Sequence, residues 1–336
     1  MNRFVFRYAM CLLSLLPGLA SANPFNTERM EKLEPVYQRI LLQEATLAAI
    51  GENFPDLVTD LEKTRKLIDG SIAGEGEKGV VDAFAKLKAD EWKAYSEEKK
   101  KTAQAEVEGT KLTQEAASKF LDECRKSHDG IAHPDLRVLL SAVPRFVKNP
   151  ELEYKEGYVV PFVTRLSPKA YKGLDIAFQV PASWDLNPSM VEGSIIAGTV
   201  TGPGMEPMLV QMDVKELDLI DGRPMTFDEA MAFASKEFSK AIEGNSQFKV
   251  IEKSDAEFSG RKYSKYVLEQ KIGDTPLVTG GVLRLVFFGT PVQGKWLSSG
   301  FGFLTFDGAP MTQVELQKHY TPLYTKMMES IVEPPK

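Results

Sequence analysis

The stretch GGVLRLVFFGTPVQGKWLSSGFGFLTFD, residues 280–307, decides the fold of the second half of this chain. It contains two strand-like apolar runs, at residues 282–288 and 296–306, separated by the segment Gly289–Gly294, which includes a proline. Two such runs joined by a short Gly/Pro loop are the pattern of a β-hairpin. The sequence therefore predicts a hairpin whose loop is the whole Gly289–Gly294 segment.

One face of the second run carries glycines where side chains would normally lie. Gly300 and Gly302 are two residues apart and share one face of the strand, whereas Phe301 and Phe303 share the other. A strip of glycine in a strand indicates a bulge, a bend, or a helix or backbone that approaches closely. We therefore expect this hairpin at the centre of a sheet.

Further strands and two helices are predicted around the hairpin. Capping boxes at Thr226–Glu229 and Thr312–Glu315 open two amphipathic helices. Because strands and helices do not alternate one by one, we expect a mainly antiparallel sheet with helices packed on it. Alternating or β-branched runs predict strands at residues 158–165, 175–180, 194–201, 208–215, 248–251 and 263–272.

Residues 174–184, LDIAFQVPASW, carry a resemblance to a known family. This segment resembles the opening F-x-x-P-x-x-W signature of the PsbP/Mog1-like superfamily, which includes DcrB-like bacterial envelope proteins. The order of the predicted elements is similar to that family over roughly residues 158–333. The resemblance implies an α/β/α sandwich and a non-catalytic binding or assembly role, with no shared catalytic residues to carry over. The first half of the chain has no counterpart in that family.

The first half is predicted to be helical. Apolar residues recur at helical spacing and β-branched runs are scarce, and the short connections favour an antiparallel bundle. Lys148-Asn149-Pro150 interrupts this pattern, so we expect an α+β protein with a helical domain at residues 23–149 and a sandwich domain at residues 150–336. The spacing predicts helices over residues 35–51, 53–70, 79–108, 113–129 and 133–143.

The segment Gly74–Gly79 matches the pattern G-x-G-x-x-G. That pattern binds phosphate when it follows a strand and opens a helix, because free N–H groups then meet the anion. Here a helix is predicted before it, and Glu75 and Glu77 would repel a phosphate. We interpret the segment as a flexible loop between helices. The charge run Glu97–Lys101 could be a docking face, but we interpret it as a solvated surface.

The first 22 residues have the features of a secretory signal peptide. Arg3 and Arg7 precede a short apolar segment, and residues 20–22 form an A-x-A cleavage site, so a mature chain would begin at Asn23. No second long apolar run follows, so no transmembrane segment is expected after cleavage. Without Arg3 and Arg7 the 41 basic residues fall to 39 against 47 acidic residues, and this net charge of −8 disfavours nucleic acid as a partner.

The residues most suited to binding a metal ion lie between 124 and 135. Cys124 and His128 are four residues apart and would share a helix face, and His133 and Asp135 follow a glycine turn at Gly130. Thiolate, imidazole and carboxylate suit zinc, or copper with fewer ligands. The alternative is purely structural: a helix ends at residues 129–130, His128 interacts with its dipole, and His133 caps the next helix.

No catalytic set is recognisable, because His319 is the only histidine of the second half and no G-x-S-x-G motif is present. We therefore expect an exported, non-catalytic binding or assembly protein of the bacterial envelope, periplasmic or secreted, whose partner is another envelope protein. The alternative is a metal-binding protein or metal-dependent enzyme using zinc or copper at Cys124, His128 and His133. A third hypothesis is a small-molecule carrier that uses the sheet face beside Gly300.

Overall fold

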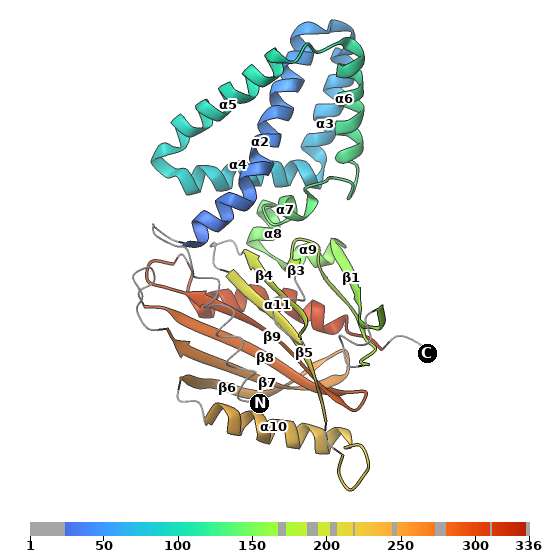
Figure 1. Ribbon diagram of the computed structural model, residues 1–336, viewed down its shortest axis with the longest axis vertical. Coiled ribbons are helices and arrows are strands. Elements are labelled where there is room, and N and C mark those ends of the chain that lie inside the picture. Colours follow the sequence, from blue (N-terminus) through green and yellow to red (C-terminus); the bar gives the residue numbers. More distant parts are fainter. Residues whose placement is uncertain are drawn as a thin grey trace. The chain divides into compact units, whose positions relative to one another are not determined.

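The protein is described from a computed structural model covering residues 24–166, 173–186, 194–201, 207–217, 219–243, 247–272, 280–309 and 311–333 (Figure 1). The signal-peptide segment predicted at residues 1–22 lies outside these residues. The chain divides into two compact units, Asn26–Asn149 and the part from Pro150 onward, and each is described by itself. Among the described residues, every helix is too short or too polar to cross a bilayer.

The first unit is helical, as predicted, and α4 runs from the lower end of α3 across α2 in Figure 1. One apolar core lies between α2, α4 and α5, and a second lies between α2, α3 and α6. Its helices are α2 (Pro24–Asn53), α3 (Val58–Gly70), α4 (Ile72–Lys88), α5 (Trp92–Gly109), α6 (Gln114–Ser127), α7 (Leu136–Leu140) and α8 (Pro144–Lys148), with 3₁₀ turns η1 (Pro55–Leu57) and η2 (Ala89–Glu91).

The first helix begins earlier than predicted. We expected Pro35 to open it, but α2 begins at Pro24 and contains Pro35 in its interior. A proline inside a helix leaves the carbonyl four residues earlier without its usual partner. That carbonyl belongs to Glu31, which is exposed and can be hydrated, so the helix continues through the proline.

The glycine-rich segment Gly74–Gly79 is not a loop, and that prediction was wrong: it lies inside α4. A Cβ atom at Gly76 would lie 2.6 Å from the carbonyl oxygen of Leu139, and one at Gly79 would lie 1.8 Å from that of Ala142. The glycines therefore allow the backbone around α7 to lie directly against α4. Close packing of two backbones outweighs the low helix propensity of glycine here.

The third predicted helix is in fact two helices. We expected one helix over residues 79–108, but the chain turns at Ala89, whose φ is 43°, and α5 then begins at Trp92. The turn brings Phe84 of α4 and Tyr95 of α5 onto the same buried ring, Tyr37 of α2, at centroid distances of 4.7 and 6.1 Å. Burying these aromatic rings explains why the chain bends there.

The second unit contains a seven-stranded sheet in the order β3-β4-β5-β9-β8-β7-β6 and a separate β1-β2 pair. All of the named strand pairs are antiparallel, which confirms the predicted sheet type. The strands are β1 (Val159–Val163), β2 (Ala177–Pro181), β3 (Asp185–Leu186), β4 (Ser194–Thr201), β5 (Pro207–Glu216), β6 (Phe248–Phe258), β7 (Arg261–Lys271), β8 (Val282–Val292) and β9 (Lys295–Thr305). The other elements are α9 (Glu151–Lys155), η3 (Thr164–Leu166), α10 (Phe227–Glu243) and α11 (Gln313–Glu329).

The β8–β9 hairpin lies in the middle of this sheet, as predicted. Its loop is shorter than predicted, because β8 continues to Val292 and only Gln293 and Gly294 form the turn. Their φ angles are 52° and 72°. Positive φ at both positions is typical of the two-residue turns whose twist matches that of the strands they join. Strand β6 is also longer than predicted; it forms an edge with alternating exposed residues.

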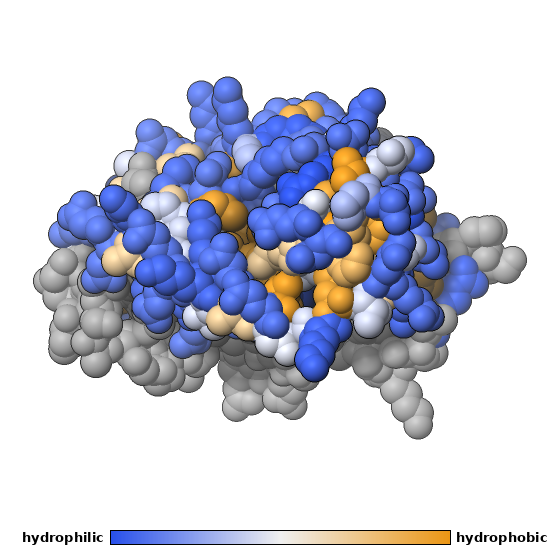
Figure 2. All heavy atoms as spheres, turned by 90° about the horizontal axis from the view of Figure 1, so that it is seen from above, coloured by the Kyte–Doolittle hydropathy of each residue, from blue (hydrophilic) through white to orange (hydrophobic). Residues whose placement is uncertain are grey.

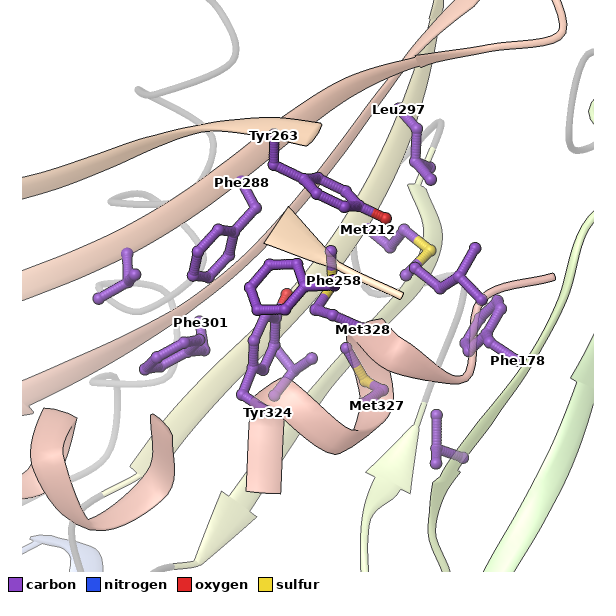
Figure 3. Close-up of a cluster of buried hydrophobic side chains, with 14 of the residues drawn as sticks. Phe178, Met212, Phe258, Tyr263, Phe288, Leu297, Phe301, Tyr324, Met327 and Met328 are labelled. Atoms are coloured by element: carbon purple, nitrogen blue, oxygen red, sulfur yellow. The ribbon is translucent and has the colours of Figure 1, made fainter. Parts of the chain in front are cut away.

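The sheet is covered by one helix on each face, so the unit has α/β/α layers. Tyr324 of α11 packs on Phe301 of β9, with ring centroids 4.3 Å apart, and Figure 3 shows the apolar side chains around this contact. On the opposite face, Ser235 of α10 and Tyr266 of β7 form a 2.8 Å hydrogen bond. At Gly302 the side chain of Leu285 fills the space where a Cβ would lie. The glycine strip therefore accommodates a neighbouring strand's side chain.

Both predicted capping boxes are present. The backbone N–H of Glu229 donates to the Thr226 hydroxyl, and the Glu229 carboxylate accepts from the backbone N–H of Thr226. Thr312 and Glu315 make the same two bonds at the start of α11. Each pair satisfies two backbone N–H groups that a helix start otherwise leaves without partners.

Candidate functional site

Three side chains that could ligate a metal meet inside the helical unit. Glu77 lies on α4, His128 follows the last residue of α6, and His133 lies in the connection to α7. One potential ligand atom from each lies within 4.8 Å of the other two. The side chains are 9%, 0% and 10% exposed, respectively, so the group is shielded from solvent.

Glycines bring these elements together. Gly130, whose φ is +69°, reverses the chain after α6 and returns it towards α4. Gly76 and Gly79 then let the segment around α7 lie against α4, on either side of Glu77 in sequence. The contact between α4 and the segment around α7 thus brings the helix that carries Glu77 next to the connection that carries His133.

Hydrogen bonds orient both imidazole rings. His128 Nδ1 lies 2.9 Å from the backbone carbonyl oxygen of Cys124, which only accepts, so Nδ1 carries a proton. The other nitrogen, Nε2, lies 3.2 Å from Glu77 Oε1. In His133 the arrangement is reversed, because Nδ1 accepts from the backbone N–H of Asp135 at 3.1 Å and Nε2 lies 3.9 Å from Glu77 Oε1.

The environment shifts the pKa of each histidine in a different direction. Burial opposes the charged form of His128, but its hydrogen bond to Glu77, the charge of Glu77 and the bond to the Cys124 carbonyl together raise its pKa. Burial and the neighbouring His128 lower the pKa of His133. One imidazole is therefore favoured as the cation beside Glu77, and the other is favoured as neutral.

The thiol of Cys124 is not a member of this group. Cys124 is buried, its Sγ lies 4.0 Å from Gln43 Oε1, and burial followed by the charge of Glu77 raises its pKa to about 12. Gln43 in turn donates from Nε2 to both carboxylate oxygens of Glu77, at 3.2 and 3.3 Å. Of the three ligands predicted from the sequence, the structure thus brings His128 and His133 together and places the Cys124 thiol outside them.

Sequence reasoning missed Glu77. It was interpreted as a loop residue, because the glycines around it suggested an irregular segment. The signal that could have identified it is its place among Gly74, Gly76 and Gly79, since glycines at this spacing can mark a helix that lies against another backbone. Asp135, the fourth residue noted in the sequence, forms an ion pair with Arg39.

A serine also lies near this group. Ser127 Oγ is 3.1 Å from His128 Nδ1, so Ser127, His128 and Glu77 form a row of contacts in space. The hydroxyl donates to the Cys124 carbonyl at 3.0 Å, and the same carbonyl accepts from Nδ1. A general base needs a free nitrogen facing the nucleophile. The contact is therefore explained as hydrogen bonding at the end of α6.

The sheet unit holds its buried ionisable groups separately. Among its described residues, no three carboxylate, imidazole or thiol groups come as close together as Glu77, His128 and His133. Its histidine, His319, is half-exposed on α11 and packs edge-on against Tyr320. Glu153 is buried in α9, where it accepts from the backbone N–H and the hydroxyl of Ser183, each at 2.7 Å.

Two cavities lie between α2 and α5 of the helical unit, and we refer to them together as the groove. One half-open cavity of about 380 Å³ lies between residues 35–42 and 98–106, and another of about 470 Å³ lies between residues 45–54 and 104–112. The second has Ala45, Ala48 and Ala49 on its α2 side. Because both helices contribute residues in increasing order, they run in the same direction along the groove.

Comparisons with known proteins concern the fold of the second half. No family model matches the chain, and no curated protein matches it either. Among similar solved structures is a cyanobacterial PsbP (CyanoP) from Synechocystis sp. PCC 6803, with 15% identity and a TM-score of 0.32, covering 53% of this chain and 93% of that one. This structure matches the C-terminal half of the chain, where the sequence resembles the PsbP/Mog1-like superfamily. The comparisons do not confirm the resemblance to DcrB-like proteins.

Two further structures are similar at the same level. A protein from Bacteroides thetaiotaomicron has 11% identity and a TM-score of 0.28, covering 52% of this chain and 48% of that one. A Pseudomonas aeruginosa protein of unknown function, PA94, has 13% identity and a TM-score of 0.28, covering 54% of this chain and 100% of that one. At these identities no function is carried over from the similar structures.

Proposed function

We propose that this is an exported, non-catalytic binding or assembly protein of the bacterial envelope that acts by contacting another envelope protein. The observation that carries the binding role is the groove between α2 and α5. This groove combines small apolar residues, half-open cavities and a charged rim. Hydrophilic residues cover most of the face in Figure 2, with apolar residues reaching the surface between them.

The groove suits an amphipathic helix of the partner. Ala48 and Ala49 follow Ala45 on α2 by three and four residues, so both lie on its face and leave room for another backbone to approach. Helix α5 contributes few buried side chains, only Ser96 and Ala103, and leaves most of its length available for contact. Both signs of charge border the groove, from Glu52, Glu108 and Lys111, so the partner helix would carry charges of both signs beside its apolar face.

The test is crosslinking in intact cells with a groove-blocking variant. Ala48→Trp would fill the groove, whereas Ala105→Trp places the same bulk on an exposed residue of α5 that does not line it. We expect the native protein and the Ala105→Trp variant to give the same crosslinked species, and Ala48→Trp to lose it. Recovery of the monomer alone from the native protein, or equal crosslinking by both variants, would overturn the proposed contact.

Export is tested separately. Fractionation of the producing cells should place the protein in the periplasm or the medium, and the first residue of the mature chain should be Asn23. A protein that stays in the cytosol with its first 22 residues intact would refute export without affecting the groove. The two parts of the proposal can therefore fail independently.

A further inference from the structure

The group formed by Glu77, His128 and His133 has the composition of a metal site that uses three protein ligands. Two imidazoles and one carboxylate are a ligand set that binds zinc in proteins, with a fourth position left for water or another ligand. The ligand atoms come from three separate elements and lie within 4.8 Å of one another in a shielded place. This group is independent of the α2–α5 groove and of the partner proposed for it.

The hydrogen bonds of His128 and Glu77 are those that ligands of a metal need. His128 Nδ1 donates to the Cys124 carbonyl at 2.9 Å, which leaves the lone pair of Nε2 directed at Glu77 in the neutral ring. Metal-ligating histidines almost always donate their other N–H to a carbonyl or carboxylate in this way. Gln43 donates to the Glu77 carboxylate and holds it in place.

The distances are close to those of a bound ion. Ligand atoms about 2.0–2.1 Å from a tetrahedral zinc lie roughly 3.3 Å apart. His128 Nε2 and Glu77 Oε1 are already 3.2 Å apart, and His133 Nε2 is 3.9 Å from the same oxygen. The ligand atoms of the two histidines lie within 4.8 Å of each other, so binding would draw His133 closer to both partners.

We propose that Glu77, His128 and His133 bind one divalent transition-metal ion of the zinc class, and that the Cys124 thiol takes no part. The ligand set differs from the one predicted from the sequence by replacing a thiolate with a carboxylate. Cys124 contributes through its backbone carbonyl, which fixes the orientation of His128.

Binding has a consequence at His133 that can be observed. In the structure His133 Nδ1 accepts from the backbone N–H of Asp135 at 3.1 Å. A ring that ligates through Nε2 carries its proton on Nδ1 and cannot accept that bond. The Asp135 amide therefore loses its acceptor when the ion binds, and His133 is the weakest of the three ligands.

The experiment titrates the chelator-treated mature protein with Zn²⁺ by calorimetry and with Co²⁺ by visible absorption. We expect one equivalent to bind, with the absorption of tetrahedral Co²⁺ and without a thiolate charge-transfer band. Glu77→Gln and His128→Gln should each weaken binding by more than about 100-fold, and His133→Gln by about tenfold. Cys124→Ser and His319→Gln should bind like the native protein.

Two controls keep the test decisive. Circular dichroism of each variant shows whether it is folded, because Glu77 and His128 are buried. If a ligand variant does not fold, the native protein is tested by NMR during Zn²⁺ addition instead. The Asp135 amide signal should then shift until one equivalent has been added. Absence of binding to the native protein, a thiolate band, an unshifted Asp135 amide, or full binding by folded Glu77→Gln and His128→Gln would each overturn the proposal.

Discussion

The two units of this chain bury ionisable groups in different ways. In the sheet unit such groups are held one or two at a time: Arg284 with Glu269, and Glu153 with Ser183. In the helical unit, by contrast, Glu77 and two histidines share one enclosed place. The sheet strands bury polar residues such as Gln211 and Arg284 at separate positions. In the helical unit, glycines allow three elements to meet at one point.

This difference indicates where chemistry specific to the chain should be sought. The resemblance of the sequence to the PsbP/Mog1-like superfamily concerns the second half, whose antiparallel sheet and two helices form a scaffold. The unusual group of side chains lies in the first half, which that resemblance does not cover. A scaffold by itself does not imply an activity. Four changes test how far the two units differ, in order of decreasing effect.

The largest effect is expected in the sheet core. Phe301 is 1% exposed and its ring contacts those of Tyr324 and Phe303. Phe301→Ala should lower the free energy of unfolding by about 3–5 kcal/mol, because it removes buried apolar surface and leaves a cavity. Chemical denaturation followed by circular dichroism measures this. Val314→Ala, at an exposed position of α11, should change it by less than about 0.5 kcal/mol; equal losses would contradict the core assignment.

The second effect is a pH dependence that arises in the sheet unit. Burial raises the pKa of Glu153 to about 7 from the ordinary 4.5. The folded protein therefore holds this proton more tightly than the unfolded chain, so the stability it contributes is complete below pH 4.5 and is lost as the pH rises through 7. The change is on the order of 3 kcal/mol.

Glu153→Gln provides the test, since glutamine can still accept from the Ser183 backbone and donate to its hydroxyl. The variant should lack the fall in stability between pH 4.5 and 7 that the native protein shows. Denaturation midpoints measured across this range give the comparison. A fall of the same size in both proteins would assign the dependence to other groups.

The third change addresses the close packing in the helical unit. Gly79→Ala places a Cβ 1.8 Å from the carbonyl oxygen of Ala142, so we expect a loss of about 2 kcal/mol from displaced backbone, despite the better helix propensity of alanine. Gly109→Ala, in the last turn of α5, meets nothing within 4 Å and should be neutral or stabilising by up to about 1 kcal/mol. If both behave alike under thermal denaturation, close approach does not explain the glycines of α4.

The smallest effect compares helix caps in the two units. Thr312 makes both bonds of a capping box with Glu315, whereas Thr113 accepts one bond, from the backbone N–H of Ala116. Thr312→Ala should cost about 1 kcal/mol and Thr113→Ala about 0.5 kcal/mol. Urea titration of the two variants measures the difference, and a larger loss at Thr113 would reverse the expected order.

Much of the fold could be predicted because its signals are local. Alternation in β5 and β9, the capping residues Thr226 and Thr312, and the central position of the glycine-containing hairpin all follow from neighbours in sequence. The length of the hairpin turn was harder to predict from the sequence. Gly289 and Pro291 suggested a loop, although both belong to β8. Trp296 covers Gly289, whose missing Cβ makes room for the ring. This contact is made between two strands, so the sequence of either strand alone does not predict it.

A helical first half, an antiparallel sheet with capped helices in the second, and two closely spaced histidines could all be read from the amino acids alone. Which groups accompany those histidines depends on how the helices pack. Glu77 is 51 residues from His128 and meets it because α4 carries glycines where the α7 backbone lies against it. Cys124 is nearer in sequence, yet its thiol lies outside the group. Helical periodicity assigns residues to faces, but which faces meet depends on packing between elements distant in sequence.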